Sequence, residues 1–110
     1  MRKVSNLVEA LYGGISYARV NYETNVANIA EAIIARANPA RAAISITNNS
    51  VNNVYLHTTN EVSPLVGIIL LPNATFILNY IDDDLEPTLE WHAAAAANNS
   101  RITIRERILQ

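Results

Sequence analysis

Short alternating segments separated by turn-forming residues constrain the fold of this chain more than any other feature. From residue 38 onward, apolar and polar residues alternate in short runs that are broken by clusters of Asn, Pro, Ser and Asp. Alternation with a period of two is typical of a strand with one buried face. This part of the sequence has no helical pattern long enough to connect parallel strands. The pattern therefore predicts an all-β fold, either an antiparallel β-sandwich or a jelly-roll-like barrel.

The clearest local pattern is a pair of strands joined by an asparagine-rich segment. Apolar residues alternate over 42–47 and again over 54–58, and the stretch between them begins with Asn48 and Asn49. Asparagine tolerates left-handed backbone and bonds its own main chain, which makes it a good turn former. We therefore expect a β-hairpin over residues 42–58.

A turn precedes this pair of strands. Asn38 and Pro39 indicate it, because proline fixes its own φ and keeps the residue before it out of the helical region. Arg41 follows directly and stands where the first strand begins. We expect it to pair near the turn with a carboxylate, for which Glu31 and Glu90 are candidates.

Several further segments read as strands. Most of them alternate, whereas residues 67–71 form a continuous apolar run that suits a strand covered on both faces. Five consecutive alanines follow Trp91 and His92, and alanine has high helix propensity. The run is short, however, and it continues an alternating segment, so we expect an extended strand of small residues. The expected strands are residues 16–23, 67–71, 75–81, 88–96 and 101–108.

Residues 25–37 are ambiguous. Val26, Ile29, Ile33 and other apolar residues fit the stripe of an amphipathic helix, for which Asn25 is a plausible N-cap. The alternative is an extended segment with alternate residues on one face. Periodicity alone favours the helix.

The amino terminus carries a short helical stripe formed by Val4, Leu7, Val8 and Leu11. A stripe of this length does not hold a helix in water by itself. The segment is therefore a docking arm, a piece that packs on its own domain, or a frayed end. We take residues 1–15 as an arm that contacts a partner and residues 16–110 as a single β-sandwich domain.

Composition excludes several classes of protein. The 110 residues fit one small domain, and 50% of them are hydrophobic, so a core forms without covalent staples. The formal charge of −2 lacks the basic footprint of a nucleic-acid binder. The chain has no cysteine, which excludes disulfides and thiolate chemistry. No apolar run approaches the roughly 20 residues that span a bilayer, and the basic start lacks the apolar core of a signal peptide.

The chain carries no convincing catalytic or metal-binding signature. Asp82, Asp83 and Asp84 form an acidic loop that could hold calcium, but the spacing of a calcium-binding loop is missing and a solvated loop is the simpler interpretation. His57 and His92 are the only histidines, and we expect both on the polar face of their strands. No nucleophile is set against a base and an orienting group, so the sequence predicts neither catalytic residues nor a cofactor nor a metal.

Charged residues in the last strand point to a contact surface. Arg101, Arg105 and Arg107 share one face of this strand, whereas Glu106 falls on the apolar side of the alternation. An inward carboxylate is unfavourable unless it is paired. Either the strand ends in solvent, or Glu106 bonds an arginine of a neighbouring subunit.

The sequence resembles small β-sandwich proteins encoded in the structural gene blocks of tailed bacteriophages. In these proteins an Asn-Pro-x-Arg turn leads into an apolar strand that ends in Asn-x-Ser, as residues 38–50 do here. A glycine-led apolar strand with a proline turn matches 67–72, and an aromatic–alanine strand matches 91–93. A closing strand that ends near a glutamate matches 102–106. This chain has Asn73 where the family has glycine after the proline turn, and its alanine run also departs from the family pattern.

This resemblance implies a structural role. The phage proteins that the sequence resembles are virion components, such as head decoration or cement proteins, head-fibre bases and tail accessory proteins. The resemblance also favours a strand near residues 29–36 over the helix. We therefore expect a non-enzymatic virion protein that self-associates, as a homotrimer, and binds other virion proteins such as the major capsid protein, with no nucleic acid or membrane partner. The alternative is a carbohydrate- or receptor-binding sandwich whose site would use Trp91, Tyr55 and the acidic loop, with aromatic rings stacking on sugars.

Overall fold

The chain folds into two antiparallel four-stranded sheets packed face to face. The computed structural model describes residues 18–62, 66–83 and 85–109. The strand order is β1-β8-β3-β6 in the first sheet, sheet A, and β2-β7-β4-β5 in the second, sheet B. The predicted fold class, an all-β antiparallel sandwich, is confirmed. The expected amino-terminal arm lies outside the described residues.

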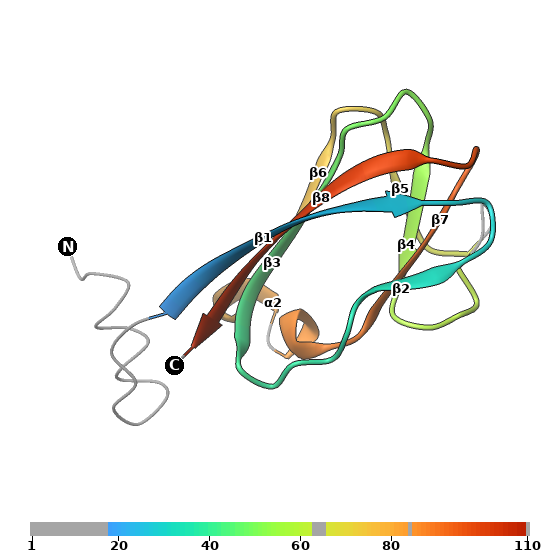
Figure 1. The fold of residues 1–110 in the computed structure, drawn as a ribbon. Coiled ribbons are helices and arrows are strands. Elements are labelled where there is room, and N and C mark those ends of the chain that lie inside the picture. The colour runs from blue at the N-terminus through green and yellow to red at the C-terminus, as the bar shows by residue number, and fades with distance from the viewer. Residues whose placement is uncertain (1–17, 63–65, 84, 110) are drawn as a thin grey trace.

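Sheet A brings the two ends of the described chain together. Strand β1 (Ala18–Ala27) pairs along its whole length with β8 (Ser100–Leu109), so that Ala18 lies opposite Leu109. Strand β3 (Arg41–Asn48) lies on the other side of β8, and β6 (Thr75–Asn79) closes the sheet beside β3. The start of β1 and the end of β8 project together beyond sheet B (Figure 1). This projection gives the molecule an elongated shape, with principal extents of 44 × 23 × 20 Å.

Sheet B consists of shorter strands. Its members are β2 (Ala32–Ala35), β7 (Trp91–Ala95), β4 (Val54–His57) and β5 (Ile68–Leu70). Between β6 and β7 the chain makes one turn of α-helix, α2 (Tyr80–Asp83), and a 3₁₀ turn, η1 (Glu86–Thr88). None of the helices in the described residues has the length and apolar character needed to cross a membrane.

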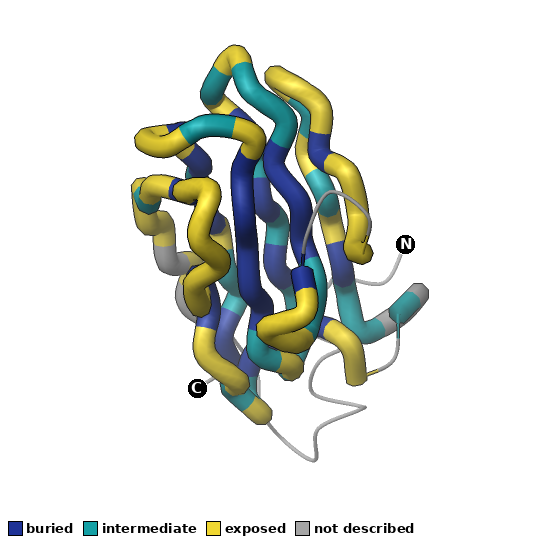
Figure 2. Tube along the Cα trace, turned by 90° about the vertical axis from the view of Figure 1, so that its right-hand side faces the viewer, coloured by how far each residue is buried: buried dark blue, intermediate teal, exposed yellow. Residues whose placement is uncertain are grey.

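The core lies between the sheets and is made of the inward side chains of both. Ile44, Ile46, Ile102 and Ile104 from sheet A are 0–1% exposed. They pack against side chains of sheet B that include Val54, Leu56, Trp91 and Ala93. Burying each such isoleucine stabilises the fold by about 1.5–3 kcal/mol. Figure 2 shows the resulting pattern, with buried segments along the middle strands and exposed residues in the loops.

The first three alanines of the run, residues 93–95, form the end of β7 against their helix propensity, although the strand expected over 88–96 covers only 91–95. Ala93 and Ala95 face the core, and Ala94 packs on the outer side of the sheet against Tyr55 and Val62. All three alanines are nearly inaccessible to solvent, at 1–4% exposure. Small side chains let the layers on both sides of β7 approach closely. Tertiary packing thus overrides the local preference of alanine.

The hairpin expected over residues 42–58 is wrong, although both strands are present. Strand β3 belongs to sheet A and β4 to sheet B, so the asparagine-rich segment carries the chain from one sheet across to the other. Ile46 and Leu56 are both fully buried and lie on opposite sides of the core. The arch is held by the buried side chain of Asn48, whose Nδ2 donates to the carbonyl oxygens of Asn52 at 2.7 Å and of Leu70, in β5, at 2.9 Å.

The ambiguous segment 25–37 is extended and contains no helix. β1 continues to Ala27, beyond the expected end of the strand predicted at 16–23, and β2 follows after a short turn. β2 covers only four of the residues expected over 29–36, and its pairing with β7 shifts between Ile33 and Ala35. The helical periodicity was therefore misleading, because a turn divides its apolar residues between two strands.

Residues 67–71 are not covered on both faces as expected. Strand β5 is the edge of sheet B, and within it Leu70 is 3% exposed whereas Ile68 and Ile69 are 39% and 55% exposed. Gly67 enters this strand with a φ of 127°, and a Cβ added there would lie 2.6 Å from the Leu56 carbonyl oxygen. The glycine is needed because the backbones approach closely and adopt a conformation that other residues avoid.

The strand predicted at 75–81 ends earlier, at Asn79, and the acidic segment begins with α2. Asp83 accepts a hydrogen bond from the backbone N–H of Asn79 at 3.0 Å, which caps the end of β6. The described residues include no group of three or more His, Cys, Asp or Glu side chains arranged to hold a metal ion. Asp84 lies outside the described residues.

Candidate functional site

The turn at residues 38–41 positions the most buried charge of the molecule. Asn38 accepts a hydrogen bond on its side-chain oxygen from the N–H of Ala40 at 2.9 Å, and Arg41 donates its N–H to the Asn38 carbonyl at 3.0 Å. The N–H of Asn38 donates to the carbonyl of Thr88 at 2.9 Å. Pro39 occupies the middle of this turn, where its fixed φ is compatible with the backbone and its missing donor is not needed. The turn therefore delivers Arg41 to the start of β3 in one orientation.

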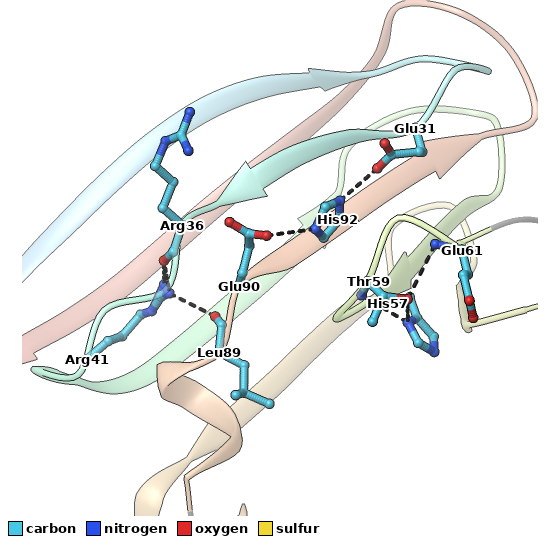
Figure 3. A network of polar contacts seen from close by, with 9 residues as sticks. All are labelled: Glu31, Arg36, Arg41, His57, Thr59, Glu61, Leu89, Glu90 and His92. Atoms are coloured by element: carbon cyan, nitrogen blue, oxygen red, sulfur yellow. Dashed lines mark hydrogen bonds and ion pairs between the residues drawn. The ribbon is translucent and has the colours of Figure 1, made fainter.

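Arg41 connects four segments through backbone carbonyls, and Figure 3 shows its bonds to Arg36 and Leu89. Its side chain is completely buried. Nε donates to the carbonyl oxygen of Pro87 at 3.0 Å. Both terminal nitrogens donate to Arg36, at 2.9 and 2.6 Å, and Nη2 also reaches Leu89 at 3.2 Å. The planar fork of donors therefore connects the end of β2, the 3₁₀ turn and the start of β7 to β3.

The carboxylate nearest Arg41 is Glu106, whose Oε2 lies 3.6 Å from Nη1. At this distance the two groups form an ion pair, but they are too far apart for a hydrogen bond. Burial lowers the pKa of Arg41, and the charge of Glu106 partly offsets that effect. The prediction that Arg41 pairs with Glu31 or Glu90 is wrong, because both carboxylates contact His92 instead. The inward Glu106 is thus paired within its own chain.

His92 lies between two glutamates on the outer side of sheet B (Figure 3). Its Nδ1 is 2.7 Å from Glu31 and its Nε2 is 3.0 Å from Glu90. His92 lies on the polar face of its strand, as expected, but its imidazole is only 8% exposed there. Burial works to lower the pKa of His92, but hydrogen bonds to the two carboxylates and their negative charges outweigh it and raise the pKa. Only the protonated ring donates from both nitrogens, which fits two carboxylate partners.

This histidine is arranged as a structural clamp. A general base needs a free ring nitrogen that reaches the substrate, and here carboxylates occupy both nitrogens. The two glutamates also lie on opposite sides of the ring, so the three groups do not converge on one point as ligands of a metal ion would. His57, its cross-strand neighbour, accepts a hydrogen bond from the N–H of Thr59 at Nδ1.

The described residues line one open cleft between the edges of the two sheets and another beside the 3₁₀ turn. The first, which we call the β1–β2 cleft, has a volume of about 470 Å³ and is lined by β1, β2 and β8, with the carboxylates of Glu23 and Glu106 in its wall. The second has a volume of about 400 Å³ and lies beside β4 and β5, with Trp91 and Glu86 in its lining. The indole Nε1 of Trp91 has no hydrogen-bond partner and is inaccessible to solvent, so this N–H does not face the cleft.

The aromatic platform of a sugar-binding site is absent from its expected place. Trp91 is 3% exposed and its ring packs edge-on against Phe76, with ring centres 5.3 Å apart. Tyr55 is 8% exposed beneath Val62 and Ala94. Neither ring offers a face on which a sugar could stack. Trp91 is a core residue, as its alternation with Leu89 and Ala93 indicates.

Exposed apolar side chains lie on the edge strands and their connections at the two open sides of the sandwich, and several of them point outward from the sheet faces. Along β1, β2 and their connection, five large apolar side chains are 39–69% exposed: Val20, Tyr22, Val26, Ile29 and Ile33. The opposite side, around β5 and β6, carries a second set that is 39–63% exposed: Val66, Ile68, Ile69, Leu71 and Ile77. These positions were missed as site residues because an apolar residue in a strand ordinarily indicates a core.

The charged residues predicted as an interface divide between two faces. Arg105 is exposed on the outer face of sheet A, where its guanidinium lies 5.5 Å from the centre of the Tyr22 ring. Arg107 is half-buried on the same face, opposite Val20, whereas Glu106 points inward to Arg41. The other predicted contact residues, Val4, Leu7, Val8 and Leu11, lie outside the described residues.

The asparagines predicted as turn formers act through side-chain bonds. Asn48 accepts on Oδ1 from the N–H of Ser50 at 2.9 Å, in addition to the two bonds that it donates. Asn49 donates its backbone N–H to the Arg101 carbonyl at 3.0 Å and its side-chain amide to Thr103, which joins the arch to β8. Asn73 has a φ of 65°. It takes the left-handed conformation that glycine would otherwise supply.

Comparison with known proteins adds little to this description. No protein-family model matches the sequence, and no curated protein matches it. Among solved structures, the chain is similar to a Bacillus endospore appendage protein, from a novel family of disulfide-linked pili, at 12% identity and a TM-score of 0.46 over 84% of this chain and 86% of that one. It is also similar to dTDP-4-dehydrorhamnose 3,5-epimerase from Bacillus anthracis str. Ames, at 14% identity and a TM-score of 0.48 over 98% of this chain and 62% of that one. Similarity of this degree carries no argument about function.

Proposed function

We propose that this chain is a non-enzymatic structural protein of a bacteriophage virion, a capsid decoration or head–tail accessory module that self-associates and docks on the particle. The observation that carries the proposal is the exposure of large apolar side chains along both open sides of the sandwich. Apolar surface of this kind is typical of sites of protein association. The resemblance of residues 38–50 and of the later strands to phage sandwich proteins supplies the setting.

The mechanism is association through rigid surfaces. The core and the Arg41 network hold both sheets in one arrangement, and the His92 clamp fixes β2 against β7, so the exposed side chains are presented without reorganisation. A binding surface that is already ordered loses less entropy on association. The amino-terminal arm, with Val4, Leu7, Val8 and Leu11, is the part that we propose to grip the shell, and the major capsid protein is the proposed partner.

Self-association with closed cyclic symmetry is the common outcome for small modules of this type, and we propose a trimer. Light scattering after size exclusion at about 10–100 μM, the range in which weak oligomers form, measures the mass. The double variant Ile69→Asp/Ile77→Asp should lower it by placing charge on the outer side of both edge strands, β5 in sheet B and β6 in sheet A. Val51→Asp is the matched control, because Val51 is 90% exposed in the arch and lies on neither open side.

Docking on the particle is tested by co-sedimentation with capsids or tails purified from the phage that encodes the chain. The full chain should sediment with the particles, and a chain without residues 2–15 should remain in the supernatant while it keeps its own oligomeric mass. A full chain that is monomeric in solution and binds neither capsids nor tails would rule out the proposed function.

A further inference from the structure

The four sheet edges of the molecule are protected to different degrees. Natural sandwiches block free edges with short strands, bulges, proline or lysine, because an open edge adds strands from other chains. The edge strand β2 is four residues long and has an irregular register, and β5 is three residues long. At β6, the carboxylate of Asp83 caps the N–H of Asn79. These three edges offer little room for another strand.

Strand β1 is the exception. It is ten residues long, it contains neither proline nor lysine, and its pairing with β8 runs without a shift from Ala18 to Ala27. Its other edge has no partner strand among the described residues. Its first half projects with the end of β8 beyond sheet B, so the edge is accessible there (Figure 1). A second strand could therefore pair with this first half of β1, residues 18–24.

The sequence of this half of β1 is complementary to itself in the antiparallel direction. With a two-fold axis at Asn21, the register places Arg19 opposite Glu23 of a second copy and Val20 opposite its Tyr22. Opposite charges and apolar pairs that face each other across a ladder both stabilise it. Moving the axis by one residue removes both matches. Arg19 then faces Asn21 of the second copy if the axis is at Val20, or its Asn25 if the axis is at Tyr22. One register is thus favoured over its neighbours.

The exposed side chains agree with this register. Val20 and Tyr22 are 39% and 69% exposed on the outer face of sheet A, and each would be covered by the other in the partner. Glu23 is exposed and forms no ion pair within the described part of the chain. Glu23 stands in the wall of the β1–β2 cleft.

We propose that two copies of this chain pair antiparallel along β1 about a two-fold axis at Asn21, which joins their A sheets into one continuous eight-stranded sheet. The contact is isologous, since the same strand serves both partners. The inference rests on the proposed function, which requires self-association, and it names one contact by which that occurs. It adds a two-fold contact to the proposed trimer, so an assembly that uses both contains six copies.

Disulfide trapping tests the register directly, because the chain has no cysteine of its own. Asn21→Cys places the two thiols on the axis, where facing Cα atoms are about 4.5–5.5 Å apart and can form a disulfide. Thr24→Cys is the control, since its two copies would stand about 20 Å apart in this register. In air, Asn21→Cys should convert largely to a linked dimer on a non-reducing gel while Thr24→Cys remains a monomer. Equal trapping of the two variants, or none in either, would refute the register.

A charge exchange provides an independent test in solution. Glu23→Arg sets arginine against Arg19 at both ends of the pairing and should raise the dissociation constant of this contact by about tenfold. The double variant Arg19→Glu/Glu23→Arg restores opposite charges and should return the constant to within about twofold of the parent. Circular dichroism verifies that each variant is folded.

The outcomes separate the two proposals. If the protein self-associates but the double variant is as weak as Glu23→Arg, the β1 contact is wrong and the proposed function stands. If the protein is monomeric at all concentrations and also fails to bind particles, both proposals fall. If the double variant recovers and Asn21→Cys is trapped, the β1 contact is established whatever particle the protein binds.

Discussion

Replacing Arg41 should destabilise the sandwich more than replacing any carboxylate near it. The side chain is fully buried and its guanidinium donates to the carbonyls of Arg36, Pro87 and Leu89. Arg41→Met leaves these three acceptors without a donor and Glu106 without its ion pair. Each lost bond to a charged group is worth about 1.5–3 kcal/mol before relaxation, and removing one partner of a buried network typically costs 3–5 kcal/mol in all. We expect a loss of about 3–5 kcal/mol in the free energy of unfolding, measured by urea denaturation.

Two further variants decide whether the geometry of the fork or only the charge matters. Arg41→Lys keeps the charge but cannot reach three carbonyls in one plane, so it should still lose about 2–3 kcal/mol. Glu106→Gln should cost less than about 1 kcal/mol, because the ion pair is long and each donor of Arg41 keeps its carbonyl. A lysine variant as stable as the parent, or a glutamine variant as damaging as Arg41→Met, would refute this reasoning.

Three other predictions follow from local geometry. Because the folded state raises the pKa of His92, the clamp contributes fully below the ordinary value of about 6.5 and is lost as pH rises through the folded value; the urea midpoint should therefore fall as pH rises above about 6.5 in the parent and stay flat in His92→Gln. Gly67→Ala should lower the free energy of unfolding by about 2–3 kcal/mol, since φ is positive and the new Cβ meets a carbonyl oxygen; an unchanged thermal midpoint would contradict this. Asn48→Ala should cost about 2–4 kcal/mol because it strips two carbonyls and an N–H of their partner, whereas Asn49→Ala, at an exposed position, should cost under about 1 kcal/mol in the same assay.

The sequence predicts the strands of this protein better than it predicts their neighbours. Alternation identifies which residues face the core, but a hairpin and an arch place the same residues inward, so the pattern over 42–58 fits both. The choice depends on Asn48, which bonds Leu70 in the opposite sheet, and nothing local in the sequence shows that contact. The pairing of β1 with β8 also joins segments about as far apart as the chain allows.

The polar interior was less predictable than the apolar one. The position of Arg41 after the Asn-Pro turn indicated a pairing role, but its partners are mainly carbonyls, which every residue possesses. His92 lies on the outer side of β7, opposite the core, as the alternation requires. It is nevertheless buried, because Glu31 and Glu90 close over it. Burial on a nominally exposed face depends on what covers that face, and strand periodicity carries no information about this.

The pairing of the first and last described strands has a consequence for biosynthesis. Sheet A places β8 between β1 and β3, so β1 has no neighbour in its own sheet until residue 109 has left the ribosome. Sheet A therefore stays incomplete until β8 has been synthesised, and β1 cannot join it earlier. During that interval the open edge of β1 is exposed together with the unpaired side of β3. A chain truncated before β8 should then accumulate as aggregate, whereas one circularly permuted through the adjacent ends of β1 and β8 should form this pair early.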